Sequence, residues 1–180
     1  MPKLTLAERE AFLDEPGILL RIATVDESGF PHVTPIWFLH EGGFVYFTPR
    51  ERSAWFGHLR ADPRVALCID EQPLPYRKVV IRGRAELLHD LGEDDDWRDL
   101  YRQIAKRYVP EEQAEGYVQG TIDQPRALYR VGLDEATVRS WRMPLDDEPQ
   151  HGIWHERYYR EGSLMAQQIA ADAPERNSDD

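Results

Sequence analysis

Residues 43–69 have the sequence GFVYFTPRERSAWFGHLRADPRVALCI, which contains in order a strand pattern, a polar loop, a short helix pattern and a second strand pattern. The first strand alternates aromatic and β-branched residues from Phe44 to Thr48, as half-buried strands do. The second strand, from Arg64 to Asp70, is apolar on both faces, so we expect it at the centre of a sheet. The polar loop between the two strands is the unusual part of the segment.

This loop concentrates groups that bind anions. Arg50 and Arg52 carry guanidinium forks, and Ser53 stands where the N-cap of the following helix would be. Free backbone N–H groups, a hydroxyl and two guanidinium groups would therefore converge on one point. Residues 49–64 hold four arginines against two acidic residues, a local charge of +2, so the loop predicts a site for one phosphate group.

The size and charge of the whole chain limit its function. With 180 residues and 41% hydrophobic content, we expect one domain over residues 1–165 and a disordered acidic tail over residues 166–180. A formal charge of −11 argues against a nucleic-acid or membrane partner, because binding to phosphate-rich surfaces needs a basic face. The sequence shows no membrane-spanning run and no secretory leader pattern, so we expect a cytoplasmic protein.

The chain as a whole reads as antiparallel strands with helices inserted at three places. The strand patterns cover residues 17–25, 30–40, 44–48, 64–70, 76–88, 126–131 and 136–141. Thr5 and Glu8 form a capping box at the first helix. Because the order lacks the βαβ rhythm of a parallel sheet, we expect a mainly β (α+β) fold, a small barrel with peripheral helices.

Two prolines mark the segment PHVTPIWF as a distorted strand. Pro31 and Pro35 cannot donate to a β-ladder, which confines them to edges, bulges or strand starts. Such a strand lets a flat ligand meet backbone groups, and a barrel edge with nothing bound is the alternative. The nearby aromatic residues include Trp37, and a phosphate loop beside an aromatic groove is what a flavin-like cofactor requires.

The motifs of several other enzyme classes are missing. The sequence contains no G-x-G-x-x-G, no phosphate-binding P-loop, no G-x-S-x-G and no H-E-x-x-H. His151 and His155 have the spacing of two metal ligands on a helix, but Pro149 and Gly152 argue against a helix there and no third ligand is near. Cys68 is the only cysteine, which excludes an intramolecular disulfide. No metal site is predicted.

Four segments carry a resemblance to a known family: ATVDESGFPHVTPIWF, GGFVYFT, HLRADPRVALCIDE and PYRKVVIRGRAEL. In this order, across residues 17–88, they resemble the pyridoxamine 5′-phosphate oxidase-like flavin-binding split-barrel family, especially its branch that uses FMN or the deazaflavin F420. The C-terminal WRMP and GIWHERYY resemble endings of that branch. The resemblance implies a six-stranded antiparallel split β-barrel, a homodimer with the cofactor at the subunit interface, and a redox or cofactor-carrying role.

The resemblance also assigns cofactor-binding residues. The strand that passes the flavin ring matches Thr34, Pro35 and Ile36. The phosphate loop matches Thr48, Arg50, Arg52 and Ser53, and Lys78 lies on the strand that often closes the site. One position departs from the family, because Trp55 stands where a lysine is common. A tryptophan there would stack on the ring or pack at the dimer contact.

We therefore expect an FMN-dependent, or alternatively F420-dependent, oxidoreductase that moves a hydride to a small molecule. No residue is singled out as catalytic, because Tyr76, His32 or bound water would each supply a proton. The alternative is a non-enzymatic protein of the same fold that stores a flavin or a haem, with a histidine such as His58 favouring haem. An unliganded structural dimer is a third reading, which the missing lysine keeps open.

Overall fold

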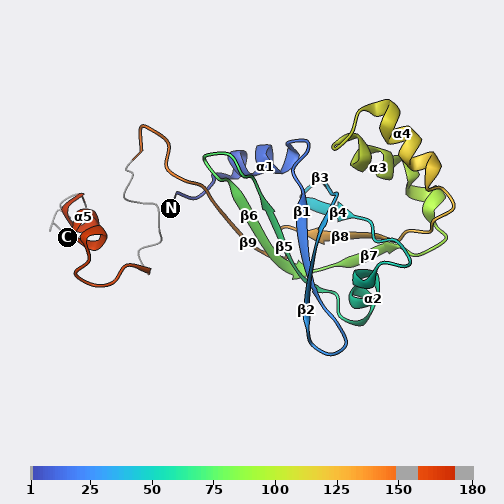
Figure 1. Cartoon of the computed structure of the whole chain (residues 1–180), viewed down its shortest axis with the longest axis horizontal. Helices are drawn as coiled ribbons and strands as arrows, with labels where there is room; N and C mark the ends of the chain where they lie inside the picture. The colour runs from blue at the N-terminus through green and yellow to red at the C-terminus, as the bar shows by residue number, and fades with distance from the viewer. Residues whose placement is uncertain (1, 149–157, 173–180) are drawn as a thin grey trace.

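The computed structural model describes residues 2–148 and 158–172 (Figure 1). Within these residues, nine strands form two antiparallel sheets, one in the order β2-β1-β5-β6-β9 and the other in the order β3-β4-β8-β7. The elements are α1 (Leu6–Asp14), β1 (Leu20–Val25), β2 (Pro31–Ile36), β3 (Leu39–Glu41), β4 (Phe44–Phe47), α2 (Ala54–Ala61), β5 (Arg64–Asp70), β6 (Lys78–Arg84), β7 (Glu86–His89), α3 (Asp94–Lys106), α4 (Glu111–Gly120), β8 (Leu128–Gly132), β9 (Thr137–Trp141) and α5 (Leu164–Asp172). This is the α+β split-barrel fold that the sequence predicts.

The structure has two strands more than the seven strand patterns of the sequence, and three more than the six that the resemblance implies, because two of the predicted strands break and change sheets. The strand expected over residues 30–40 becomes β2 and β3, and at the break the N–H of Phe38 donates to the Tyr108 hydroxyl (3.1 Å). The strand expected over residues 76–88 becomes β6 and β7, and the N–H of Ala85 donates to the carbonyl of Pro63 (2.7 Å). At the first break the N–H of Phe38 leaves the ladder, whereas at the second the Ala85 bond is the last one on the β5 side before β7 pairs with β8 in the other sheet.

One main core is shared by residues from both sheets, α1 and α2. Alternate residues of β1, including Leu20 and Ile22, are fully buried, and so are Leu67 of β5 and Ile81 of β6. Burial of each such side chain contributes about 1.5–3 kcal/mol. Strand β5 lies between β1 and β6 at the centre of its sheet, which confirms the interpretation of its two apolar faces.

The first helix begins at the predicted capping box. The Thr5 hydroxyl accepts from the N–H of Glu8 (3.2 Å), and the Glu8 carboxylate accepts from the N–H of Thr5 (2.7 Å). Because these bonds satisfy donors that a helix start leaves without partners, the helix holds Phe12 and Leu13, both fully buried, in the main core.

Helices α3 and α4 form a separate hairpin that lies beyond β7 and β8 (Figure 1). The Arg102 side chain of α3 binds Glu115 of α4 (2.8 Å). Between the helices and β8 lies a second apolar cluster that includes Trp97, Tyr101 and Leu128. This hairpin places side chains of α4 next to the loop that follows β4.

Helix α5 covers residues 166–172 of the segment expected to be a disordered tail. The end of that tail, residues 173–180, and the HGIWH segment, residues 151–155, lie outside the described residues. Among the helices of the described part, none has both the length and the apolar character needed to cross a membrane.

Candidate functional site

The loop between β4 and α2 keeps the start of the helix free of a side-chain cap. Ser53 occupies the N-cap position, as predicted, but makes no capping hydrogen bond. Its hydroxyl donates instead to the carbonyl of Arg50 (2.6 Å). The backbone N–H groups of the first turn therefore keep their partial positive charge for an anion. Thr48, half-buried, lies at the other end of the same loop.

The two arginines of the loop do not converge on that point. The Arg50 guanidinium donates to the Tyr117 hydroxyl of α4 (2.8 Å) and to the side-chain oxygen of Gln124 (3.2 Å). The Arg52 side chain is exposed to solvent. The reason is a backbone bridge between Arg50 and Arg126, which fixes the backbone of Arg50 beside the α3–α4 hairpin. Arg52 alone remains beside the start of α2.

Trp55, assigned from the resemblance to cofactor contact, lies instead in the core. Its side chain is 8% exposed, and its ring lies 6.1 Å from that of Phe47. Phe56 and Leu59 share the buried face of α2. In this chain the indole therefore packs α2 against the barrel, and the surface near the loop lacks the cation that a lysine would add.

The three residues assigned to the flavin ring lie on an edge strand. Strand β2 pairs only with β1 within the described residues, so it is an edge strand, one of the three positions that its prolines allow. Thr34 and Ile36 are half-buried on one face of β2. Pro35 and Val33 lie on the other face, where Val33 is 61% exposed.

Strand β2 and helix α2 also bring together two histidines that the sequence leaves scattered. The rings of His32 and His58 meet edge to face, with 5.4 Å between centroids and 76° between planes. Nδ1 of His58 lies 3.0 Å from the hydroxyl of Thr24, which is buried. His32 lies on the same face of β2 as Thr34, because residues two apart in a strand share a face. This spacing is the signal in the sequence that places His32 near the residues assigned to the flavin ring.

Lys78 lies at a distance from β2 along the sheet. It begins β6 and pairs with Trp141 of β9, over whose ring its ammonium group lies at 5.8 Å from the centroid. Strands β1 and β5 separate β6 from β2. Three strand spacings correspond to about 14 Å, so one chain does not bring Lys78 to Thr34.

Sequence reasoning missed the residues that surround Arg50. Arg126 stands opposite Arg50, is 6% exposed, and lies over the ring of Tyr101 at 4.4 Å. Burial raises the pKa of Tyr101. Burial also acts to raise the pKa of Tyr117, but the nearby Tyr101 hydroxyl and the charge of Arg126 outweigh it, so that the pKa of Tyr117 is lowered. No sequence motif identifies Arg126 as a site residue, because it comes near Arg50 only through the backbone bridge between the two.

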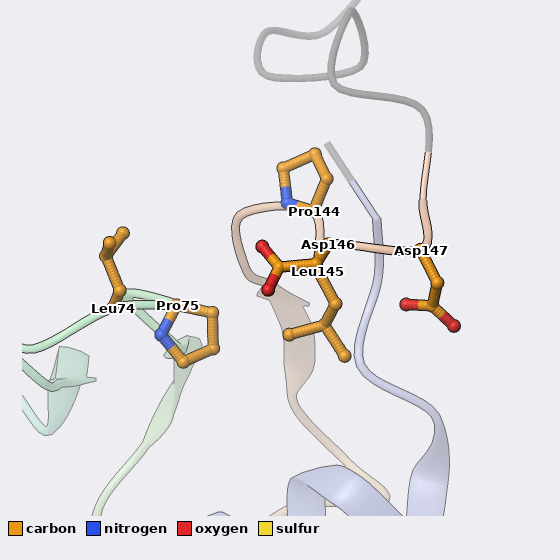
Figure 2. Close-up of a pocket in the computed structure, with 6 residues that line it drawn as sticks. All are labelled: Leu74, Pro75, Pro144, Leu145, Asp146 and Asp147. Carbon is orange, nitrogen blue, oxygen red and sulfur yellow. The ribbon is translucent and has the colours of Figure 1, made fainter.

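A cavity of about 420 Å³ has none of these residues in its lining (Figure 2). It is lined by Leu74, Pro75, Pro144, Leu145, Asp146 and Asp147. The two carboxylates argue against an anionic ligand there. The described residues contain no group of three or more histidine, cysteine or acidic side chains that would hold a metal ion.

Comparisons with known proteins agree with this architecture. A search of curated proteins found no match. Three solved structures share the fold. An FAD-binding protein from Mesorhizobium loti is 20% identical, with a TM-score of 0.55 over 77% of this chain and 95% of that one. An F420 reductase is 24% identical, with a TM-score of 0.51 over 68% of this chain and 90% of that one, and HutZ, a haem storage protein from Vibrio cholerae, is 20% identical, with a TM-score of 0.56 over 74% of this chain and 94% of that one. The family model of pyridoxamine 5′-phosphate oxidase matches residues 6–140. The chain therefore belongs to the pyridoxamine 5′-phosphate oxidase family.

Proposed function

We propose that this protein binds a flavin-type cofactor, FMN or alternatively F420, and uses it to pass a hydride to a small molecule. The observation that carries the proposal is the start of α2, where no side chain caps the helix and the exposed Arg52 lies beside it. A helix N-terminus with an adjacent guanidinium group suits a phosphate. The FAD-binding protein and the F420 reductase that share the fold support the same class of ligand.

The residues of this chain would bind and orient the cofactor, which supplies the hydride chemistry when bound. Thr48, Arg52 and Ser53 would hold its phosphate at the start of α2. Residues 34–36 of β2 would lie along its ring, with Arg50 stabilising the loop from the α4 side.

A homodimer completes this arrangement. Because Lys78 lies about 14 Å from β2 in its own sheet, we propose that the Lys78 that closes a site comes from a second copy of the chain. Phe30 and Val33, which are 70% and 61% exposed at the β2 edge, would be covered in the same contact. Burial of two such side chains favours association.

His32 is the residue best placed to give a proton to the reduced substrate. It lies on the same face of β2 as Thr34, and its ring rests against His58, whose Nδ1 is held by Thr24. Tyr76 lies in the loop before β6 and is 42% exposed. A group fixed by packing keeps a proton in place better than an exposed loop residue does.

The test is to identify by mass spectrometry any small molecule that co-purifies, and then to titrate apo-protein with FMN and F420. Replacing Arg50 and Arg52 together with alanine should weaken cofactor affinity about tenfold or more, or about 1.4 kcal/mol. The matched control is Arg139→Ala, which removes an exposed arginine from β9. Absence of binding at micromolar FMN and F420 would refute the oxidoreductase proposal.

Haem storage is the second candidate, supported by the shared fold with HutZ and by the contact between the half-buried rings of His32 and His58. The ring centroids of His32 and His58 are 5.4 Å apart in edge contact. His58 would hold a haem iron through Nε2, because Nδ1 already has the Thr24 hydroxyl as its partner. A haem Soret band that His58→Ala abolishes would support storage, and an unchanged band would reject it.

A further inference from the structure

The guanidinium groups of Arg50 and Arg126 lie together without an acidic partner. An antiparallel bridge sets the two residues opposite each other. Backbone hydrogen bonds from Glu51 to Pro125 (3.0 Å) and from Ala127 to Pro49 (3.1 Å) fix the two chain segments on either side. Two neighbouring guanidinium groups repel each other, so a negative charge beside them would stabilise this arrangement.

The described residues do not supply that charge. Several other arginines of this acidic chain bind carboxylates, as Arg77 binds Glu71 (2.6 Å) and Arg142 binds Glu148 (2.6 Å). Within residues 2–148 and 158–172, no ion pair is formed by Arg50 or Arg126. The nearby Asp94 carboxylate accepts from the backbone N–H of Arg126 (3.0 Å) rather than from its guanidinium group.

Neutral groups occupy part of the space instead. The Tyr117 hydroxyl accepts from Nη2 of Arg50 (2.8 Å) and from Nη2 of Arg126 (3.4 Å). Gln124 takes another N–H of Arg50. Nε of Arg126 is buried and has no hydrogen-bond partner among the described residues. A donor buried without a partner is unfavourable, and Arg126 is 6% exposed.

The neighbouring rings add an apolar wall. Trp37 stacks on Tyr108 with 5.0 Å between centroids and lies 5.2 Å from the ring of Tyr117. Arg50 is half-buried, and Gln124 beside it is exposed. The cluster therefore opens to solvent on the Arg50 side, with buried positive charge behind an aromatic surface.

We propose that Arg50, Arg126 and Tyr117 form a binding site for a phosphoryl group, distinct from the start of α2. A phosphate dianion balances two guanidinium charges, and its oxygens accept from planar forks. It would displace Gln124 from Arg50 and accept from the free N–H groups of the pair. The phosphoryl group is either that of the cofactor, which would then lie here in place of the start of α2, or that of a separate phosphorylated substrate, and the site does not depend on the proposed redox activity.

The direct test is calorimetric titration of apo-protein with inorganic phosphate at neutral pH and constant ionic strength. We expect binding with a dissociation constant of about 1 mM or below, weakened about tenfold or more in Arg126→Met. Arg60→Met is the matched control, because Arg60 already binds Asp90 at the surface (2.6 Å). Unchanged phosphate affinity in a folded Arg126→Met variant would overturn the proposal, and so would the absence of binding by the wild type.

Arg50→Met decides the question if Arg126→Met does not fold, because Arg50 is only half-buried. The same loss of affinity is expected there, and retained affinity would overturn the site. A second readout is the ultraviolet absorbance of tyrosinate. Bound phosphate offsets the guanidinium charges and should move the ionisation of Tyr117 to higher pH, a shift absent from Tyr117→Phe. An identical titration with and without phosphate would contradict the contact.

Two further experiments identify the source of the phosphoryl group and test the phosphoryl site separately from the oxidoreductase proposal. Competition between phosphate and FMN that Arg126→Met weakens would assign this cluster, in place of the start of α2, to the phosphate of the cofactor, whereas simultaneous binding would assign the cluster to a phosphorylated substrate. Arg52→Ala should weaken cofactor binding but leave phosphate affinity at this cluster unchanged. Failure of cofactor binding with phosphate binding intact would reject the oxidoreductase proposal alone.

Discussion

Replacing Trp55 with alanine is expected to destabilise the protein by about 3–5 kcal/mol, while the folded variant keeps its cofactor affinity. The side chain is 8% exposed and packs beside Phe47. A tryptophan that buries about 200 Å² contributes about 5 kcal/mol at ~25 cal/mol per Å². This is an upper value, because the unfolded chain already buries part of the surface. The measured loss should therefore fall at or below it.

The assay is urea unfolding followed by circular dichroism, paired with a cofactor titration of the same variant. Leu74→Ala is the control, since Leu74 is 70% exposed and its loss should change stability by no more than about 0.5 kcal/mol. A loss below about 1 kcal/mol for Trp55→Ala, together with clearly weaker cofactor binding, would place the indole in the cofactor site and refute its core role.

Two other substitutions test contacts outside the loop. Thr24→Val should cost about 1 kcal/mol in unfolding free energy, because Nδ1 of His58 loses its partner at 3.0 Å; unchanged stability would contradict that hydrogen bond. Hydrogen bonding by Arg77 lowers the pKa of Glu71 below its ordinary 4.5. The pair therefore stabilises the folded protein at pH values above the pKa of Glu71 in the unfolded chain, and this stabilisation is lost as the pH falls through the pKa of Glu71 in the folded protein. The difference in stability between wild type and Glu71→Gln should therefore be largest near neutral pH and shrink in acid, and a difference independent of pH would refute the assignment.

Much of the local structure could be predicted because it depends on neighbouring residues. The capping box of Thr5 and Glu8 needs only residues three apart, and Pro31 and Pro35 confine β2 to an edge by losing their N–H groups. Apolar residues on both faces of β5 likewise place it centrally. The resemblance extends the same local patterns to the family and the barrel.

The candidate site was predicted only in part, because side-chain direction depends on contacts between distant residues. The N-cap position of Ser53 follows from sequence, but its bond to the carbonyl of Arg50 does not. Trp55 belongs to the predicted short helix, but the resemblance assigned it to the cofactor or the dimer contact, and its burial appears only when α2 packs on the barrel. His32 and His58 meet because β2 and α2 do.

The sequence by itself determined the elements, the edge and centre of the main sheet, and an arginine-rich loop that favours an anion. Only the tertiary structure decided where those arginines go: it turned Arg50 toward α4 and set it opposite Arg126, a residue 76 positions away in the chain. Local periodicity is encoded by steric and hydrogen-bonding preferences of adjacent residues. Which charged side chains meet depends on contacts between residues far apart in the chain, formed when long loops close. No single stretch of sequence contains that information.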